Sequence, residues 1–539
     1  MKRKIIIGSR GSDLALWQAH FVLGELKKLK IDVELKIIKT QGDKIQNLSF
    51  DKLEGKGFFT KEIEDALLNK EIDLAVHSHK DLPTEFPKGL TIAAVSDRED
   101  PSELLLINKN AVDEKQKFSL KQNAVIGTSS ARRKSQLLAW RNDLKIEDLR
   151  GNVPTRIQKL RDKKYDAILI ANAGVSRLEV DLSGFHCEKL DVQEFIAAPA
   201  QGVLALQIRE SDKELFEKLQ SLNNKEVAET IGVERKVLNL FDGGCQLPLG
   251  VYCECLTPDP SLKERGTPLY KVWVAKAEKA NSFPKYFYFE SRKPEGLAEK
   301  IVAKINSAVM SPSGGGEGGG RVFISRDEKR NDFFKRCLEA NGYKVFCQSL
   351  IEVKQILIRK YKKCDWVFFS SKNAVKHFFE QKPDVEGVKF GAVGKSTAEE
   401  IRKFGKRAEF IGNADDTRMT GKKFSALVGN KTVLFPQAKE SMKSIQLQLP
   451  KRENVVDLIV YETIMKSQVT SHKSKFDTLV FTSPSNVESF LEKNKINAEQ
   501  KVVAMGDATA NALKKHGVKT NKQPASFDDL GLVQAVMSL

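Results

Sequence analysis

A ten-residue glycine- and serine-rich segment divides this chain more clearly than any other feature of its sequence. Residues 311–320 read Ser-Pro-Ser-Gly-Gly-Gly-Glu-Gly-Gly-Gly and offer nothing for a hydrophobic core. Such a composition is typical of a flexible linker. It leaves about 310 residues before it and about 220 after it, enough for several domains. We therefore predict two independently folded units joined end to end.

Composition excludes several classes of protein. With 41% hydrophobic and 30% charged residues over 539 positions, the chain can bury sizeable cores and is not disordered as a whole. No run of about 18 apolar residues predicts a membrane span. The apolar stretch near Met1 is too short for a signal peptide. Seven scattered cysteines do not form a disulfide framework, so we expect a reducing, cytoplasmic location.

The net charge of +18 is concentrated after the linker. Residues 321–539 hold 39 basic and 25 acidic side chains, a net charge of +14. This balance suits an anionic partner such as a nucleic acid, a membrane surface or a polycarboxylate. Because no long basic block and no zinc-finger, RNA-recognition or basic-zipper spacing occurs, we expect neither a nucleic-acid nor a membrane partner.

The first unit alternates short apolar strands with helices. Strands are predicted at 4–7, 33–38, 72–76 and 167–170, and the segment 125–130 is predicted as a strand that runs into a capped helix over 132–140. Further helices are predicted from Leu14, over 61–68 and over 152–159. Alternation of this kind predicts an α/β fold with parallel or mixed sheets covered by helices. Ligands of such folds bind outside the carboxyl ends of the strands.

The second unit contains an internal repeat. Residues 367–375 match residues 479–487, and residues 393–398 match residues 505–510, both at an offset of 112. Two separate motifs with one offset predict two similar α/β lobes. Each lobe would present a strand ending in hydroxyl side chains and a helix start at a shared cleft.

Two loops of the first unit favour binding of anions. Gly8-Ser9-Arg10-Gly11-Ser12 and Gly127-Thr128-Ser129-Ser130-Ala131-Arg132-Arg133 each lie between a strand and a helix. Free N–H groups there bind carboxylates or phosphates, and arginine adds a bidentate donor. Ordinary helix capping is the alternative for either loop alone. Two loops together, with Arg150 and Arg156 at the next strand–helix junction, favour a cleft for a polyanion.

A third group of polar residues follows the apolar strand 72–76. Here Asp81, beside Lys80, is suited to stabilise a cationic intermediate. His77 and His79 could ligate a metal, but no third ligand has a recognisable spacing, so we expect no metal. The alternative is a solvated turn ended by Pro83.

Two further loops carry candidate functional residues. Cys245, after two glycines, would be accessible as a covalent anchor or nucleophile; a buried, inert cysteine is the alternative. Cys253 and Cys255 alternate on a predicted strand and look structural. The loop 52–59, which ends in Phe58 and Phe59, either covers a site or packs its aromatics into the core.

These motifs together identify a resemblance over residues 1–310. The segments Gly8–Ser12 with Leu14–Ala19, Gly55–Gly57, Val76–Asp81, Gly127–Arg133, Leu149–Asn152 and Gly243–Gln246 resemble those of porphobilinogen deaminase (hydroxymethylbilane synthase). Two segments depart from the family pattern. Thr40-Gln41-Gly42-Asp43 has Gln41 in place of arginine, and Pro199-Ala200-Gln201-Gly202 has Ala200 in place of glycine.

The resemblance implies a chemistry for each candidate residue. Cys245 would carry a dipyrromethane cofactor through a thioether, and Asp81 would be the catalytic carboxylate. Cofactor carboxylates would be bound by Ser12, Lys80, Thr128, Ser130, Arg132 and Arg133. Substrate would be bound by Arg10, Phe59, Arg150, Arg156 and Arg177. Four porphobilinogens would be joined with loss of ammonia, each through a cationic azafulvene. The cofactor and the product together would present about a dozen carboxylates, and binding these would require several arginines.

The family fold implies two lobes like those of periplasmic binding proteins and a small third α/β domain. The expected domains are 1–100 with 200–217, 101–199, and 218–310 with the cofactor cysteine. The loop 52–59 would be the lid.

The second unit resembles uroporphyrinogen-III synthase. The resemblance rests on Ser325-Arg326, Val460–Thr463, Phe481–Ser485 and Met505–Ala510. It implies closure of hydroxymethylbilane with inversion of its last ring, assisted by Tyr461, with Ser483, Ser485 and Thr509 binding carboxylates. Expected lobes are 321–354 with 464–539, and 355–463. Gln437 stands where the family often has arginine, and a packed aromatic at a strand end is the alternative for Tyr461.

The overall expectation is a bifunctional enzyme of tetrapyrrole and heme biosynthesis, a deaminating transferase joined to a cyclising lyase. We expect a cytoplasmic monomer acting on the small molecules porphobilinogen and hydroxymethylbilane. A solute- or anion-binding protein and a nucleic-acid binder are the rival classes. The Gly-Gly-Cys loop and the group around Asp81 argue against both.

Overall fold

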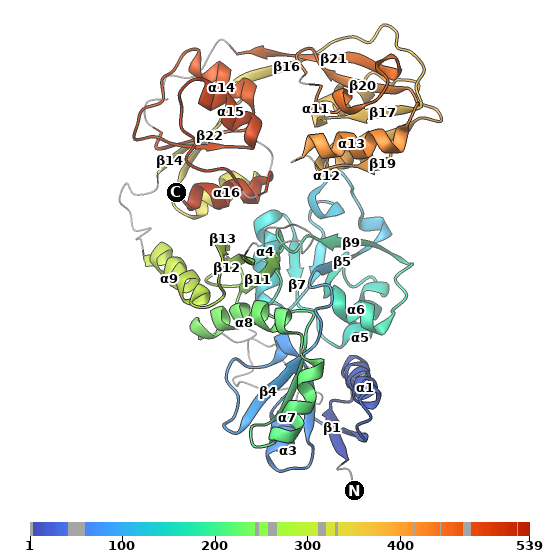
Figure 1. Cartoon of the computed structure of the whole chain (residues 1–539), viewed down its shortest axis with the longest axis vertical. Helices are drawn as coiled ribbons and strands as arrows, with labels where there is room; N and C mark the ends of the chain where they lie inside the picture. The colour runs from blue at the N-terminus through green and yellow to red at the C-terminus, as the bar shows by residue number, and fades with distance from the viewer. Residues whose placement is uncertain are drawn as a thin grey trace. The chain divides into compact units, whose positions relative to one another are not determined.

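The structure is a computed structural model that divides into two compact units (Figure 1). Unit 1 comprises Met1–Gly318 and Asn331–Gly342, and unit 2 comprises Gly319–Arg330 and Tyr343–Leu539. The first boundary falls inside the glycine-rich segment. The described residues are 4–40, 60–242, 247–256, 267–310, 320–328, 332–413, 416–441, 443–466, 476–524 and 526–539.

The first sheet of unit 1 has five strands. Their order is β2 (Val33–Ile37), β1 (Ile5–Ser9), β3 (Leu74–Ser78), β10 (Leu204–Arg209) and β4 (Leu90–Val95). β1, β2 and β3 are parallel, whereas β10 runs antiparallel to both of its neighbours. Helices α1 (Asp13–Lys28) and α3 (Lys61–Leu68) bury apolar side chains such as Leu26 and Leu67 against strands of this sheet.

The second sheet repeats this topology. Its order is β7 (Lys145–Glu147), β6 (Val125–Gly127), β8 (Ala167–Ala171), β5 (Glu103–Asn108) and β9 (Phe185–Leu190). The fourth strand, β5, is again antiparallel to both neighbours. Its first residue, Glu103, pairs with Ala171 at the carboxyl end of β8, just as Leu204 of β10 pairs with Ser78 at the carboxyl end of β3. Both crossing strands therefore begin at the edge where α/β folds bind ligands.

Helices α4 (Ala131–Trp140), α5 (Val153–Arg161) and α6 (Asn172–Leu178) follow strands β6, β7 and β8. Ser130 and Asn152 cap α4 and α5 by accepting the backbone N–H groups of Arg133 and Thr155. These caps fix where each helix begins, and therefore where the side chains of its first turn lie.

A smaller part of unit 1 follows α7 (Lys213–Leu219). Helices α8 (Lys225–Leu240) and α9 (Leu297–Met310) accompany the antiparallel sheet β11 (Leu249–Leu256), β12 (Leu269–Lys276) and β13 (Lys285–Ser291). Glu234 of α8 is fully buried and bonds to both terminal nitrogens of Arg98, at 2.7 and 3.2 Å. It also accepts the N–H groups of Ala200 and Cys253. This carboxylate thus connects α8 to β11 and to both chain segments that pass between the first two sheets.

Helix α10 (Phe333–Ala340) belongs to unit 1 although most residues around it in the sequence belong to unit 2. The Phe333 ring stacks on Trp140 of α4 with centroids 3.8 Å apart. Arg336 donates hydrogen bonds to the carbonyls of Leu138 and Ala139 at the end of α4. Unit 1 is therefore discontinuous in sequence.

Unit 2 contains two sheets. One has the order β15 (Lys344–Cys347), β14 (Arg321–Ile324), β22 (Thr478–Phe481) and β23 (Lys501–Ala504). The other has the order β16 (Ile351–Gln355), β21 (Val455–Met465), β20 (Val433–Ala438), β17 (Trp366–Phe369), β18 (Lys389–Ala392) and β19 (Ala408–Ile411). Helix α13 (Thr417–Val428) precedes β20, and α16 (Asp529–Met537) is the last helix described.

The repeat in the sequence corresponds to repeated structure. Strand β17 with helix α11 (Lys372–Phe379) lies 112 positions before β22 with α14 (Pro484–Leu491). Strand β18 with helix α12 (Lys395–Arg402) begins 112 positions before β23 with α15 (Asp507–Lys515). Each sheet of unit 2 holds one copy.

The mixed α/β architecture predicted for both units is confirmed. One boundary differs in a way that affects the site. The strand predicted at 72–76 lies at Leu74–Ser78, because Ala75–Ser78 pair with residues 204–207 of β10. His77 and Ser78 therefore belong to the strand and do not follow it. Among the described residues, no helix combines the length and apolar character that a membrane span requires.

Candidate active site

The carboxyl ends of β1 and β3 carry one half of the predicted site. Arg10 follows β1, and Ser12 precedes α1 without capping it through its side chain. After β3, a single 3₁₀ turn formed by His79–Asp81 leaves Asp81 exposed and Lys80 half-buried. Lys80 donates its ammonium proton to Oε1 of Gln201 at 3.1 Å.

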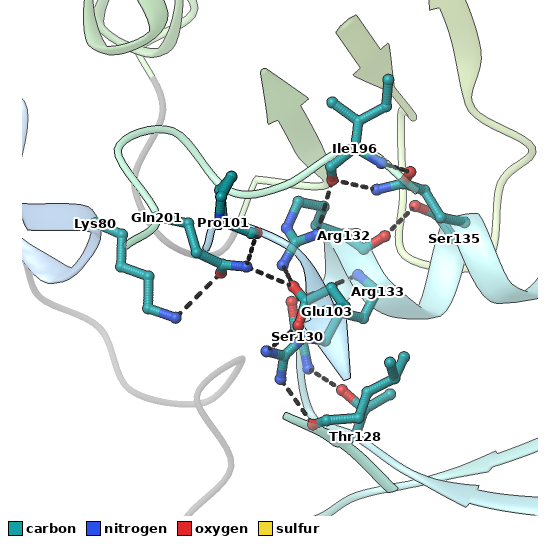
Figure 2. Close-up of polar contacts among 12 residues, drawn as sticks. Lys80, Pro101, Glu103, Thr128, Ser130, Arg132, Arg133, Ser135, Ile196 and Gln201 are labelled. Carbon is teal, nitrogen blue, oxygen red and sulfur yellow. Dashed lines mark hydrogen bonds and ion pairs between the residues drawn. The ribbon is translucent and has the colours of Figure 1, made fainter. Parts of the chain in front are cut away.

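The carboxyl end of β6 carries the other half. Thr128 is buried, and its hydroxyl accepts the N–H of Ser130. Arg132 and Arg133, on the first turn of α4, are 5% and 7% exposed. Both guanidinium groups point at the carboxylate of Glu103, as Figure 2 shows. The two arginines are therefore paired inside the protein and are not free bidentate donors.

Three more predicted arginines lie on this second lobe. Arg156 of α5 donates Nε–H to the Gly151 carbonyl at 2.7 Å, and Arg150 lies half-buried before the same helix. Arg177 of α6 is buried, donates to the Gly202 carbonyl at 2.7 Å and lies over the ring of Trp17. It therefore contacts the returning crossover segment and α1.

Charged groups at the two sheets of unit 1 shift the pKa values of one another. Burial lowers the pKa of Lys80. The charges of Asp81 and Glu103 raise this pKa, and those of Arg133 and Arg132 lower it. Burial, with Arg133 and Arg150, lowers the pKa of Arg156 to about 10, whereas Asp81 acts in the opposite sense. Asp81 is therefore close to cations from both sheets.

This crowding of cations fits a polycarboxylate. The Nε–H of Arg133 is buried without a hydrogen-bond partner among the described residues. An anionic ligand would satisfy such a donor and relieve the repulsion that lowers the pKa of Arg156. A dipyrromethane with its acetate and propionate groups has this chemistry. The predicted anchor Cys245 and the predicted contact Phe59 lie outside the described residues.

The two histidines of the motif serve the core of the first sheet. His77 Nε2 donates to Oε1 of Gln207 at 3.1 Å, and Gln207 donates to Glu64. Burial lowers the pKa of His77 to about 4 and that of His79 to about 3, so both are neutral near pH 7. Within the described part of the chain, no group of three or more metal-ligating side chains occurs.

One predicted residue of unit 2 lies on a strand, and the other three lie at the helices that follow strands of the other sheet. Ser483 caps α14 by accepting the N–H of Asn486, and Ser485 lies two positions further on that helix. Thr509 of α15 is buried, with its hydroxyl bonded to the Met505 carbonyl at 3.0 Å. These three follow strands of the four-stranded sheet, whereas Tyr461 lies on β21 of the other sheet.

Tyr461 is 8% exposed, and its hydroxyl shares a 3.2 Å hydrogen bond with that of Ser371. Burial raises the pKa of its phenol. Gln437, noted for replacing an arginine, is buried and accepts a hydrogen bond from Gln446 at 2.7 Å.

Two polar residues of the first unit were not predicted to belong to the site. Glu103 opens the apolar run Leu-Leu-Leu-Ile of β5, and Gln201 lies in the Pro-Ala-Gln-Gly segment. Both contact predicted cofactor-binding residues. A carboxylate at the head of a fully apolar strand is the signal that would have found Glu103, because buried charges are normally paired.

Comparison with known proteins agrees with this site. Residues 5–217 match the family model described as porphobilinogen deaminase, dipyromethane cofactor binding domain, and residues 332–534 match that of uroporphyrinogen-III synthase HemD. The porphobilinogen deaminase of Chloroherpeton thalassium is 40% identical over 316 residues, which cover 58% of this chain and 95% of that protein. That of Oceanobacillus iheyensis is 44% identical over 252 residues, 46% of this chain and 80% of that protein.

Among solved structures, the uroporphyrinogen-III synthetase of Helicobacter pylori aligns with 41% of this chain and 100% of its own, at 18% identity and a TM-score of 0.32. The similarity to the two curated deaminases is far stronger in sequence and covers 80% and 95% of their lengths. The chain therefore belongs to the porphobilinogen deaminase family and continues into a HemD-type uroporphyrinogen-III synthase region, which makes it a bifunctional enzyme of tetrapyrrole biosynthesis.

Proposed function

We propose that unit 1 joins four porphobilinogen molecules into hydroxymethylbilane at the residues around Asp81, and that the region 332–534 then closes this product to uroporphyrinogen III. The observation that carries the first step is the closeness of one exposed carboxylate, Asp81, to half-buried cations from both sheets, Lys80 and Arg156. A site of this charge pattern binds acidic substrates and stabilises a cation that forms among them.

The basic residues would bind and orient the carboxylates of the substrate, the growing chain and the cofactor. Each porphobilinogen brings two carboxylates, and the bound chain gains two with every addition. The carboxylates of the substrate and the growing chain would be bound by Arg10, Lys80, Arg150, Arg156 and Arg177. The cofactor would be held by Arg132 and Arg133. Dipyrromethane, when bound, would supply the pyrrole carbon to which the first substrate is joined.

Asp81 would be the acid at the reacting atoms. Loss of ammonia from porphobilinogen leaves positive charge on the pyrrole and its methylene carbon. A carboxylate close to this charge lowers its free energy and accepts or returns the pyrrole N–H proton as the charge moves. The exposure of Asp81 leaves its oxygens accessible to a substrate.

The tether for the cofactor is proposed at Cys245. Its glycine-flanked position suits an accessible thiolate. Peptide mapping that finds the pyrrole mass on any other cysteine would refute this assignment.

For the second step, we infer that Tyr461 assists loss of the hydroxyl group from hydroxymethylbilane. The hydrogen bond to Ser371 fixes the direction of its phenol, and its high pKa keeps it a proton donor. Ser483, Ser485 and Thr509 would bind carboxylates at the helix starts after β22 and β23.

We also propose that the chain acts as a monomer in the cytoplasm. The six cysteines among the described residues are all unpaired, as a reducing compartment requires. Sedimentation at working concentration tests the oligomeric state.

The decisive experiment is incubation of the whole chain with porphobilinogen, followed by typing of the uroporphyrin isomer after oxidation. Isomer III is expected, because both steps are needed for inversion of the last ring. Isomer I alone would refute the second activity, and no tetrapyrrole at all would refute the first.

A further inference from the structure

A fully buried carboxylate organises the cations of the deaminase site. Glu103 is 0% exposed and opens β5. Its two oxygens are divided between neighbours on α4: Oε1 lies 2.5 Å from Arg132 Nη2, and Oε2 lies 2.7 Å from Arg133 Nη2. One carboxylate therefore bridges both guanidinium groups.

The remaining contacts of the two arginines fix their orientation. Arg132 also donates through Nη1 to the Ile196 carbonyl at 2.8 Å, and Arg133 donates through Nη1 to the Leu169 carbonyl at 3.0 Å. Each guanidinium group thus has one carboxylate and one carbonyl acceptor. In this arrangement the buried Nε–H of Arg133 has no acceptor among the described residues.

Glu103 also reaches the lysine of the opposite lobe. Gln201 donates through Nε2 to Oε1 of Glu103 at 3.2 Å and to the Pro101 carbonyl at 2.7 Å. Its Oε1 accepts from Lys80 at 3.1 Å. Figure 2 shows Gln201 lying between Lys80 and Glu103. Because Glu103 and Gln201 lie at the two segments that pass between the sheets, this chain of contacts joins both lobes.

We propose that Glu103 is a positioning residue of the deaminase site, which with Gln201 holds Arg132, Arg133 and Lys80 in the arrangement that receives the carboxylates of the cofactor and the substrate. The proposal rests on the proposed function of unit 1. Glu103 contacts no ligand in this role and acts only through the three cations.

The charge of Glu103 is essential to the role. Burial opposes ionisation of Glu103, but Arg133, Arg132 and Lys80 together hold its pKa well below the usual range. Burial and Arg133 lower the pKa of Arg132, and Glu103 raises it. A neutral side chain of the same shape would leave two adjacent buried guanidinium groups to repel each other, so they would separate or turn toward solvent.

The test compares two buried glutamates in the full chain. Glu103→Gln removes the charge next to the predicted cofactor-binding residues. Glu234→Gln is the matched control, because Glu234 is equally buried and ion-paired, but its partners are Arg98 and the N–H groups of Ala200 and Cys253 and not Arg132, Arg133 or Lys80. For each variant we would measure the melting temperature, the share of purified molecules that carry the cofactor mass, and KM and kcat for porphobilinogen.

Both variants are expected to melt earlier by a similar amount. Only Glu103→Gln should raise KM at least tenfold and lower the share of molecules carrying the cofactor mass, and Glu103→Asp should bring KM back to within threefold of wild type. A merely structural role predicts equal KM for both variants, and that result overturns the proposal. A wild-type chain that neither carries the mass nor consumes porphobilinogen overturns the proposed function with it.

A second pair of variants avoids the burial of an unpaired charge, in case Glu103→Gln does not fold. Gln201→Leu breaks the link from Glu103 to Lys80. Gln220→Leu, the control, removes a half-buried amide of unit 1 that donates to the Ala93 carbonyl at 2.7 Å and lies outside the contacts that join Arg132, Arg133, Lys80 and Glu103. We expect KM to rise at least threefold for Gln201→Leu and not for Gln220→Leu; equal KM values would count against the role assigned to this network.

Discussion

Asp81 and the cations around it have opposite environments. The carboxylate is exposed, whereas Arg132 and Arg133 are buried and Lys80 is half-buried. Its side chain therefore contributes little to folding and is available for chemistry, in keeping with the weak effect of most surface substitutions on stability. The arginines, in contrast, are part of the folded core as well as of the site.

Replacing Asp81 should separate activity from stability. We expect Asp81→Ala to abolish consumption of porphobilinogen and to change the free energy of unfolding by less than about 0.5 kcal/mol. Asp32→Ala, at an exposed position between α1 and β2, is the control and should keep both properties. Turnover and thermal unfolding measured on the same preparations test this; an active Asp81→Ala enzyme would mean that the carboxylate is misassigned.

His79 is a buried base that remains neutral. Its pKa is about 3 because of burial, followed by the charges of Arg235 and of His77, and its Nδ1 is buried without a partner among the described residues. As pH falls below 6.5, the unfolded chain binds the proton and the folded chain does not. Stability present above pH 6.5 is therefore lost between pH 6.5 and about 3.

We accordingly expect His79→Leu to stabilise unit 1 more at acidic pH than at neutral pH. At pH 5 the extra gain over the gain at pH 7.5 should be about 2 kcal/mol, from 1.36 kcal/mol per pH unit. His20→Ala, on the exposed face of α1, serves as the control. Unfolding curves at the two pH values decide the matter; an equal gain at both would show that His79 does not set the acid sensitivity.

Site residues that come directly after a strand in the sequence could be predicted, whereas a site residue distant in the sequence from the others could not. Arg132 and Arg133 were identified because they open a capped helix directly after β6. Glu103 was missed because it meets them only through the antiparallel return of β5 beside β8. No local pattern encodes that pairing, since strand register is set by contacts across the whole sheet.

At the scale of elements, the two crossing strands organise unit 1. β5 and β10 are the antiparallel fourth strands of their sheets, and the segments before them connect the lobes. Gly202, just before β10, has φ of +93°, and its carbonyl accepts from Arg177. A Cβ at this position would lie 2.2 Å from the Glu99 carbonyl oxygen. Only glycine fits this close approach of the two segments.

Two glycine substitutions should therefore have opposite effects. Gly202→Ala is expected to destabilise unit 1 by about 3 kcal/mol or more, because the positive φ and the backbone clash add. Gly24→Ala, in α1 where nothing lies within 4 Å, should stabilise it by up to about 1 kcal/mol. Denaturant unfolding of both variants measures the difference, and a stable Gly202→Ala protein would contradict the crossover geometry.

Element types were predictable where periodicity is strong. The helix expected at 61–68 and the strands expected near 4–7, 33–38 and 167–170 are present within one or two residues. The antiparallel insertion of β10 between β3 and β4 was not predicted, because it pairs residues that are more than 100 positions apart in the chain. The same pairing extends β3 through His77 and Ser78.

At the scale of the whole molecule, two successive enzymes share one chain. A tether raises the concentration of the second site around the product of the first. Hydroxymethylbilane also closes spontaneously to the wrong isomer, so capture by a nearby second site would matter most in dilute solution.

A protease site inserted within residues 311–319 tests the value of the tether. We expect the share of isomer III formed from porphobilinogen to fall after cleavage in dilute enzyme, and to recover when both pieces are concentrated. Isomer typing of the same sample before and after cleavage measures this. An unchanged share at every dilution would remove any role for the covalent connection.

Helix α10 has a consequence for the order in which the molecule forms. A ribosome releases the chain from its amino end, so all other elements of unit 1 emerge before residues 333–340 do. Until then Trp140 lacks the ring of Phe333, and the last carbonyls of α4 lack the guanidinium group of Arg336. The first enzyme therefore completes its fold only after translation has entered the family region of the second. A message truncated at the glycine-rich segment would yield a deaminase in which one face of the Trp140 ring lacks its stacking partner.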